Sequence, residues 1–321
     1  MTPRRPPAAL ALTMCGDYEA ARVREALIES IGQLGGLQKF VRTGDSVLLK
    51  PNFIAPAPRE NAAQTDPEII VQLAVLLKEI GAKPFVGDSP AWGTVFDCVR
   101  ALGLVERLQK LDVPVRQLNK PRWIKVQPSG ARVGISSIAL DCDKIINLPK
   151  LKDHRQLGAT IAVKNMFGCV SGKAKPLWHY ARGSSERRFS EMLLGVYNSV
   201  TPALNIVDGI TAMEAGGPIN GKPRKLGIIV TSADPFACEI VCAEIIGIAE
   251  QDLPILRTAR EIGLCSFTRD DIAVLGSRVE DCICPDFVHL ERIPIKFTLA
   301  RVCKSLVKQI VKLAGSAIRI N

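Results

Sequence analysis

Apolar runs and amphipathic helical patterns alternate along the first part of this 321-residue chain, and this alternation limits the folds open to it. Residues 8–14 predict a strand, and residues 18–34 have a helical periodicity that ends at a glycine pair. A strand at 45–49, a helix at 67–80 and a strand at 83–86 follow with short connections. This order is typical of a parallel sheet. We therefore predict an α/β fold, with a mostly parallel sheet flanked by helices.

The rest of the chain continues this pattern as far as residue 275. The further predicted helices are 94–111 (with a break near Gly103), 189–200, 235–246 and 253–262, and the further strands are 113–118, 123–126, 133–138, 145–148, 203–207, 226–230 and 272–275. Asp66 and Asp234 each precede a proline, which predicts a helix N-cap; Thr65 and Glu68 could instead form a capping box. We predict one α/β domain over residues 1–280 and a basic C-terminal tail over residues 281–321.

The net charge of +10 is unevenly distributed. Residues 287–321 contain seven Lys and Arg residues and one acidic residue, so this segment carries +6 and the rest of the chain +4. A nucleic-acid surface is not needed to explain such a distribution, and we expect no nucleic-acid partner. No run of about 18 apolar residues predicts a membrane span. The N-terminal apolar run is too short and too broken by proline for a signal peptide, so we expect a cytoplasmic protein.

The tail has a second reading besides a helix that docks on the domain. Residues 296–314 are amphipathic, with apolar residues on one face and four basic residues on another at spacings of three and four. Such a helix can also lie on an anionic membrane surface or on a partner. Peripheral membrane contact through the tail is therefore an alternative.

Ten cysteines are present, but no two have the C-x-x-C spacing of common zinc and redox sites. Most lie among Val, Ile and Leu, as buried free thiols do. The tight pair Cys282 and Cys284 is the one place where the sequence suggests an iron-sulfur cluster, and no other cofactor is indicated.

Several apolar runs end in polar residues beside Pro or Gly. The carboxyl ends of parallel strands share one edge of a sheet, so these side chains are expected to meet in a pocket there. The candidate ligand-binding residues are Lys50, Asn52, Asp88, Lys150, Lys152 and Asn165. The number of lysines indicates an anionic small molecule or a metal complex as the ligand. Loops over residues 164–180 and 211–221 are expected to form flexible rims of the pocket.

Three residues are candidates for catalysis: His154, Lys164 and Asp208. Residues 150–155 read as a polar, cationic loop after the strand at 145–148, and His154 in that loop could be a proton donor or simply an exposed histidine. Lys164 lies inside an apolar stretch, where a lysine needs a partner or a ligand. Asp208 follows a predicted strand, where it could act as a base or metal ligand or make an Asx turn. The Gly168 to Lys173 segment is not a P-loop, because three residues separate its glycines and Ala174 replaces the Ser or Thr.

The chain resembles the DUF362 family in a series of motifs between residues 45 and 276. They are Leu49-Lys50-Pro51-Asn52, Thr65-Asp66-Pro67, Gly81-Ala82, Val86-Gly87-Asp88-Ser89-Pro90, Ile146-Asn147-Leu148-Pro149-Lys150-Leu151-Lys152-Asp153-His154, Lys164-Asn165-Met166-Phe167-Gly168, Val207-Asp208-Gly209-Ile210, Gly217-Pro218 and Ala233-Asp234-Pro235-Phe236-Ala237. The resemblance implies an iron-sulfur protein for the many members that carry a ferredoxin-like segment after this domain. This chain departs from them, since only Cys282, Cys284 and then Cys303 follow Gly276. Where the family pattern usually has an Asp after the last motif, Cys238 and Glu239 stand here.

The resemblance transfers no general reaction. From the residues we expect an enzyme or cofactor-handling protein that binds its anionic ligand or metal complex at the strand ends. A non-catalytic iron-sulfur or electron-transfer protein and a membrane-associated binding protein that acts through its tail are the alternatives. The oligomeric state is left open.

Overall fold

The centre of the molecule is a twisted, mostly parallel β-sheet. The computed structural model describes residues 8–172 and 175–295. The main strands are β1 (Ala8–Met14), β2 (Ser46–Pro51), β3 (Lys83–Asp88), β4 (Val115–Gln117), β7 (Lys144–Leu148), β10 (Leu204–Glu214), β11 (Lys222–Ser232) and β12 (Ile272–Gly276), in the spatial order β12-β1-β11-β10-β7-β2-β3-β4. β11 runs antiparallel to both of its neighbours, and the other adjacent pairs in this order are parallel. The α/β fold expected from the sequence is confirmed.

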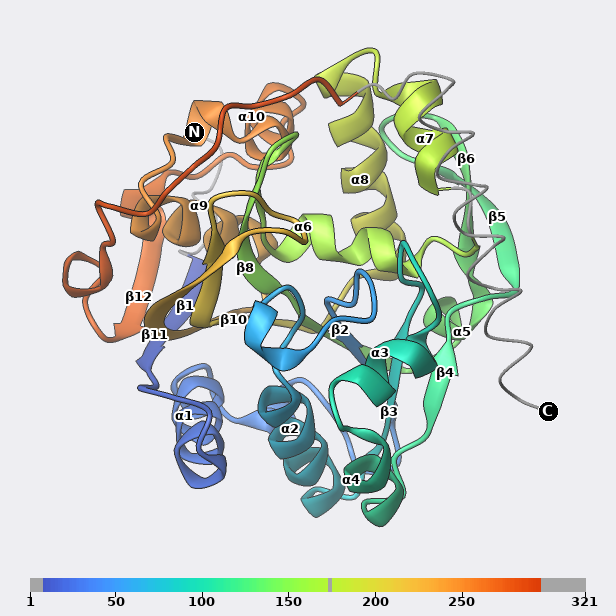
Figure 1. The fold of residues 1–321 in the computed structure, drawn as a ribbon, viewed down its shortest axis with the longest axis vertical. Helices are drawn as coiled ribbons and strands as arrows, with labels where there is room; N and C mark the ends of the chain where they lie inside the picture. The colour runs from blue at the N-terminus through green and yellow to red at the C-terminus, as the bar shows by residue number, and fades with distance from the viewer. Residues whose placement is uncertain (1–7, 173–174, 296–321) are drawn as a thin grey trace, which may run out of the picture.

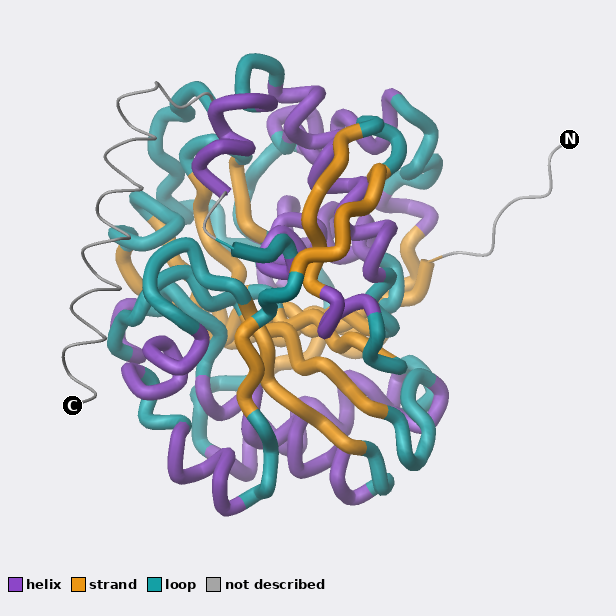
Figure 2. Tube along the Cα trace, turned by 90° about the vertical axis from the view of Figure 1, so that its right-hand side faces the viewer, coloured by secondary structure: helices purple, strands orange, loops and turns teal. Residues whose placement is uncertain are grey.

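Helices cover both faces of this sheet (Figures 1 and 2). One layer holds α1 (Ala20–Gln33), α2 (Pro67–Glu79), α3 (Val95–Ala101) and α4 (Val105–Lys110), and the other holds α6 (Ala162–Asn165), α8 (Glu186–Val200), α9 (Pro235–Ile245) and α10 (Pro254–Glu261). α5 (Ser137–Leu140), α7 (Lys175–Arg182) and a hairpin of β5 (Pro121–Val126) and β6 (Ala131–Ser136) lie beside the second layer.

Alternate side chains of β2 belong to different hydrophobic cores. Val47 and Leu49 pack with α1 and α2, whereas Leu48 packs in the core that contains α8 and α9. Successive residues of a strand point to opposite faces, so a strand buried on both sides has a continuous apolar sequence. This is why the strands of the sheet read as uninterrupted apolar runs.

Both predicted Asp-Pro helix starts are present. The Asp66 carboxylate accepts a hydrogen bond from the Glu68 amide at 2.9 Å, and Asp234 accepts from the Phe236 amide at 2.8 Å. In each case the proline occupies the first turn, where its missing N–H costs nothing. The Asp66 cap is therefore the one adopted at α2.

Three local predictions were wrong. Residues 150–155 were expected to form a loop, but Lys150–His154 is the buried strand β8, which pairs with β10 and with β9 (Gly158–Thr160). Asp208 does not end a strand, because β10 continues to Glu214 after an irregularity between Gly209 and Thr211. Much of the supposed loop at 164–180 is helical, in α6, a 3₁₀ turn at Met166–Cys169 and α7. β8 is buried between β10 and β9, and its polar composition is what misled the prediction.

The chain after β12 runs back over the domain, drawn in red in Figure 1. The Cys284 amide donates to the Ile245 carbonyl at 2.8 Å, and the Ile293 amide donates to the Arg155 carbonyl at 2.8 Å. The first residues of the predicted tail thus pack on the α/β domain. The amphipathic segment 296–314 lies outside the described residues. Across residues 8–172 and 175–295, no helix has the length and apolar character needed to cross a membrane.

Candidate functional site

A cavity of about 450 Å³ lies where β8 ends, between the start of the second helical layer and the turn that joins β10 to β11. Its lining residues are Ile54, Ala91, Trp92, His154, Arg155, Gln156, Lys164, Phe167, Lys175, His179, Gly216, Gly217, Pro218, Ile219, Asn220 and Ile293. Three of these carry a cationic side chain, and none of these described residues is an Asp or Glu. The described lining of the cavity therefore combines apolar walls with cationic side chains.

Lys164 enters the cavity from α6. Its Nζ lies 5.2 Å from the centre of the Phe167 ring, within cation–π range. Among the residues that the structure describes, no carboxylate or carbonyl lies within hydrogen-bonding distance of this amine. Burial, reinforced by the nearby charge of Lys50, lowers the pKa of Lys164 to about 8.

His154, the last residue of β8, is buried in the cavity wall. Its Nδ1 accepts a hydrogen bond from the Gln156 amide at 3.2 Å, so the neutral ring carries its proton on Nε2. Burial first, and then the charge of Lys164, lower the pKa of His154 well below its ordinary value. The imidazole is therefore neutral at pH 7 and can donate through Nε2–H.

His179 on α7 is held among aromatic rings. Its ring lies 4.6 Å from that of Phe189 and 6.2 Å from that of Phe167, centre to centre. Burial lowers the pKa of His179 to about 3. This histidine is uncharged at physiological pH and contributes shape to the cavity together with Phe167.

Lys152 fixes the turn that forms one wall of the cavity. Its Nζ donates to the Ala63 carbonyl at 2.6 Å and to the Pro218 carbonyl at 3.1 Å. The next residue, Asp153, accepts a hydrogen bond from the Gly216 amide at 3.3 Å. Burial, followed by the charge of Lys164, lowers the pKa of Lys152 well below its usual range. Lys152 therefore supports one wall of the cavity from behind and is not a lining residue.

Lys50 and Asp88 form a buried ion pair next to Gly168. Lys50 Nζ lies 2.9 Å from Asp88 Oδ2, and the Phe53 amide donates to the same carboxylate. Gly168 packs directly on the pair, since an added Cβ would overlap both side chains. These two predicted ligand-binding residues are satisfied by each other and by the backbone.

The predicted ligand residues Asn52 and Asn165 belong to a chain of amides that crosses the sheet. Asn52 Nδ2 donates to Asn165 Oδ1 at 2.7 Å, and Asn165 Nδ2 donates to Asn147 Oδ1 at 2.8 Å. Asn147 Nδ2 in turn donates to Asn205 Oδ1 at 2.8 Å. Asn165 sits one residue after Lys164, so this chain holds α6 against the strands.

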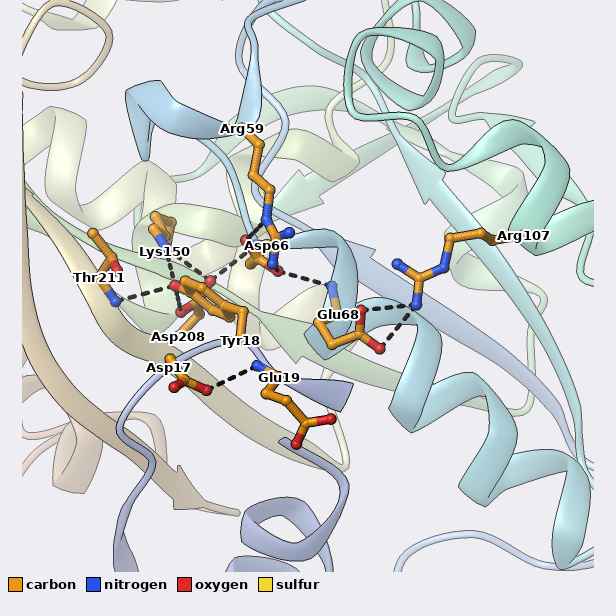
Figure 3. A network of polar contacts seen from close by, with 10 residues as sticks. All are labelled: Asp17, Tyr18, Glu19, Arg59, Asp66, Glu68, Arg107, Lys150, Asp208 and Thr211. Atoms are coloured by element: carbon orange, nitrogen blue, oxygen red, sulfur yellow. Dashed lines mark hydrogen bonds and ion pairs between the residues drawn. The ribbon is translucent and has the colours of Figure 1, made fainter. Parts of the chain in front are cut away.

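Lys150 and Asp208 lie in a different place, in the network of Figure 3. Lys150 Nζ lies 2.9 Å from Asp208 Oδ2 and donates to the Tyr18 hydroxyl at 2.8 Å, and that hydroxyl donates to Asp208 Oδ1 at 2.7 Å. Arg59 pairs with Asp66 above the Tyr18 ring. A smaller cavity of about 230 Å³ opens beside these groups. The expected pocket is thus divided, with Asp208 remote from the cavity that holds His154 and Lys164.

A family model and a known relative each match more than half of this chain. The model described as "Domain of unknown function (DUF362)" matches residues 47–244. A thylakoid-associated protein of Synechocystis is 37% identical over 292 residues, which span 91% of each chain. This protein belongs to the DUF362 family.

Two solved structures are similar to part of this chain at low identity. A lactate racemase apoprotein from Thermoanaerobacterium thermosaccharolyticum is 13% identical with a TM-score of 0.48, over 75% of this chain and 58% of that chain. A protein from Thermotoga maritima is 14% identical with a TM-score of 0.43, over 68% of this chain and 56% of that chain.

The two cysteines predicted as cluster ligands in this DUF362 protein have other neighbours. Cys282 Sγ lies 3.7 Å from the Met14 sulfur, and Cys284 Sγ lies 3.1 Å from an Arg224 nitrogen. Within the described part of the chain, no three His, Cys, Asp or Glu residues are grouped as metal ligands. The iron-sulfur prediction gains no support from these positions.

Sequence reasoning did not select Trp92, Arg155 or Lys175 for the DUF362 site, although all three line the cavity. The Lys175 ammonium donates to the Ser89 carbonyl, which draws α7 towards the end of β3. A signal for Arg155 was present, since it follows His154 directly. Trp92 and Lys175 come from segments far apart in the sequence, and no local pattern connects them.

Proposed function

We propose that this DUF362 protein binds an anionic small molecule with an apolar body in the cavity at the end of β8, and that His154 and Lys164 act on it. The observation that carries the proposal is the lining of the cavity. Arg155, Lys164 and Lys175 face a space with no acidic residue among its described lining residues. A ligand that carries negative charge would complete this electrostatic arrangement.

The contrast with the other lysines supports an anion as the ligand. Lys50 and Lys150 are more deeply buried, and each has an internal carboxylate. A buried cation is costly unless it is paired. Lys164 lacks such a partner in the described structure, so a bound carboxylate or phosphate would take that role.

The apolar part of the lining supports a ligand with a hydrophobic or aromatic portion. Trp92, Phe167 and Ile219 contribute to the walls. Small-molecule sites commonly combine apolar walls with a few polar groups that fix orientation. The volume of the cavity is within the usual range for such sites.

An enzymatic role is supported by the protonation states of two residues. Lys164, with a pKa of about 8, can exchange a proton near neutral pH, and neutral His154 can donate a hydrogen bond through Nε2–H. Groups with perturbed pKa values that converge in a cavity are typical of acid–base sites. We therefore assign proton transfer to Lys164 and hydrogen bonding to the ligand to His154, and leave Asp208 out of the reaction.

Calorimetric titration with benzoate, phenyl phosphate and benzyl alcohol tests the proposal. We expect both anions to bind more tightly than the neutral alcohol. Lys164→Met is expected to weaken anion binding by at least about tenfold, or about 1.4 kcal/mol. His154→Ala is expected to weaken it as well, without loss of the fold by circular dichroism.

Lys125→Met is the matched control, because Lys125 is exposed on β5 and does not line the cavity. It is expected to bind both anions as the wild type does. If Lys164→Met and His154→Ala also bind them with unchanged affinity, the site assignment is wrong.

We also propose peripheral membrane association as a second function. It is supported by the name of the thylakoid-associated relative and by the basic segment 287–321. In flotation with anionic liposomes, the full chain should float with the liposomes, whereas a variant that ends before residue 296 should not. Equal flotation of both would count against this role.

A further inference from the structure

Lys164 differs from Lys50, Lys150 and Lys152 in what holds its amine. Lys50 and Lys150 are each bound to a carboxylate, and Lys152 donates to two backbone carbonyls. Lys164 meets the face of the Phe167 ring instead. A ring face attracts an ammonium but offers no lone pair in a fixed direction, so it leaves the amine free to react.

We infer that Lys164 forms an imine with its ligand, which is then an aldehyde or ketone that also carries an anionic group. This inference rests on the proposed function and names the class of ligand. It places the carbonyl carbon at Lys164 Nζ and the anionic group towards Arg155 or Lys175, which line the same cavity.

The chemistry requires a neutral amine and a hydrogen-bond donor for the carbonyl oxygen. The lone pair of Lys164 attacks the carbonyl carbon, and one amine proton passes to the carbonyl oxygen to give a carbinolamine. The remaining amine proton passes to the hydroxyl group, which leaves as water, and a C=N bond remains. No oxidant or reductant is consumed, because the amine and carbonyl together lose one molecule of water.

The surroundings of Lys164 favour both requirements. Burial and the charge of Lys50 lower the pKa of its amine to about 8, so a usable fraction is neutral near pH 7. His154 lines the same cavity, and its Nε2–H is available because Nδ1 already accepts from the Gln156 amide. His154 can therefore donate a hydrogen bond to the carbonyl oxygen as negative charge develops there.

The test traps the imine by reduction. The full chain is incubated with 4-carboxybenzaldehyde and sodium cyanoborohydride, which adds hydride to the imine carbon and leaves a stable secondary amine. Peptide mass mapping should find the adduct at Lys164. In this adduct a 4-carboxybenzyl group replaces one hydrogen of the lysine amine. Excess 4-(hydroxymethyl)benzoate, which has the anionic group but no carbonyl, should protect that residue.

Two variants complete the experiment. Lys164→Arg keeps the positive charge but cannot form an imine, so the adduct at this position must disappear while 4-(hydroxymethyl)benzoate still binds. Lys175→Arg keeps Lys164 and should still be labelled there. Binding of the alcohol without labelling of Lys164 by the aldehyde would overturn the imine and leave the proposed function standing. Failure of both compounds to bind would overturn both.

Discussion

Gly217 packs directly against the backbone carbonyl of Asp153. A Cβ atom at residue 217 would overlap that oxygen. On either side of this contact, the Gly216 amide donates to the Asp153 carboxylate and Lys152 Nζ donates to the Pro218 carbonyl. The β10–β11 turn is therefore held on β8 at three adjacent points, and it forms one wall of the larger cavity.

Gly217→Ala is expected to push the turn away from β8. The overlap is with backbone, which cannot rotate aside, so we expect a loss of about 1–3 kcal/mol in the free energy of unfolding. Affinity for benzoate should fall as the wall moves. Urea denaturation and calorimetric titration measure the two effects.

Gly32→Ala is the matched control for that substitution. An added Cβ at Gly32, inside α1, meets no atom within 4 Å. It should be neutral or stabilise the protein by roughly 0.5–1 kcal/mol, because alanine is the better helix former. Equal destabilisation by the two substitutions would contradict the role given to Gly217.

Lys50→Met is expected to destabilise the protein strongly. It leaves the Asp88 carboxylate buried without its ammonium, and breaking a buried pair in this way costs about 3–5 kcal/mol. The double variant Lys50→Met with Asp88→Leu should recover most of the loss, because neither charge remains. Thermal and urea unfolding of the single and double variants measure this recovery.

Arg122→Ala serves as the comparison for an exposed ion pair. Arg122 and Asp141 are 53% and 56% exposed, so their pairing contributes about 0–1 kcal/mol. A cost at Lys50 no larger than that at Arg122 would show that the buried pair does not stabilise the site as argued.

Glu239→Gln is expected to change how stability depends on pH. Burial raises the pKa of Glu239 to about 7, although the Val163 amide donates to it at 2.9 Å. The folded state therefore keeps a proton that the unfolded state loses between about pH 4.5 and 7, so stability falls as pH rises through that window. Above it the cost is complete, up to about 3 kcal/mol.

Glutamine keeps an oxygen for the Val163 amide and has no charge to bury. The urea midpoints of Glu239→Gln at pH 4.5, 6 and 8 should therefore lack the fall with rising pH that the wild type shows. A wild type and a variant with parallel pH profiles would refute the assignment.

Anion binding should weaken as pH rises through about 8, where Lys164 loses its proton.

The contribution of Lys164 to the free energy of unfolding should become more favourable as pH rises. The folded-state pKa of Lys164 lies below its unfolded value of about 10.5, so the cost of burying its charge is complete below pH 8 and is relieved as pH rises towards 10.5. Lys164→Arg stays charged and should bind benzoate equally at pH 7 and 9. A fall in benzoate affinity near pH 8 that persists in Lys164→Arg would show that another group titrates there.

Most of the fold could be predicted from the sequence because its signals are local. Proline after Asp66 and Asp234 marked two helix starts, and apolar runs such as residues 226–230 marked buried strands. β8 could not be recognised in this way. Its lysines are acceptable in a strand because Asp208 and two carbonyls, distant in sequence, accept hydrogen bonds from their ammonium groups.

The candidate site was predicted in part. His154 and Lys164 do share a cavity, but Lys50 with Asp88, and Lys150 with Asp208, prove to be internal ion pairs. The sequence shows that a lysine is close to apolar residues, but not whether a carboxylate reaches it. That distinction depends on strand pairing, which brings together residues more than fifty positions apart, such as Lys150 and Asp208.

The position of β1 bears on how the chain acquires its structure. β1 precedes the other described strands in the sequence, yet it pairs with β11 on one side and with β12 on the other, across more than two hundred residues. Its two hydrogen-bonding edges therefore stay unpaired until β11 and β12 have been synthesised. Contacts of such large sequence separation slow folding, and an unpaired strand edge can pair with another chain in the meantime.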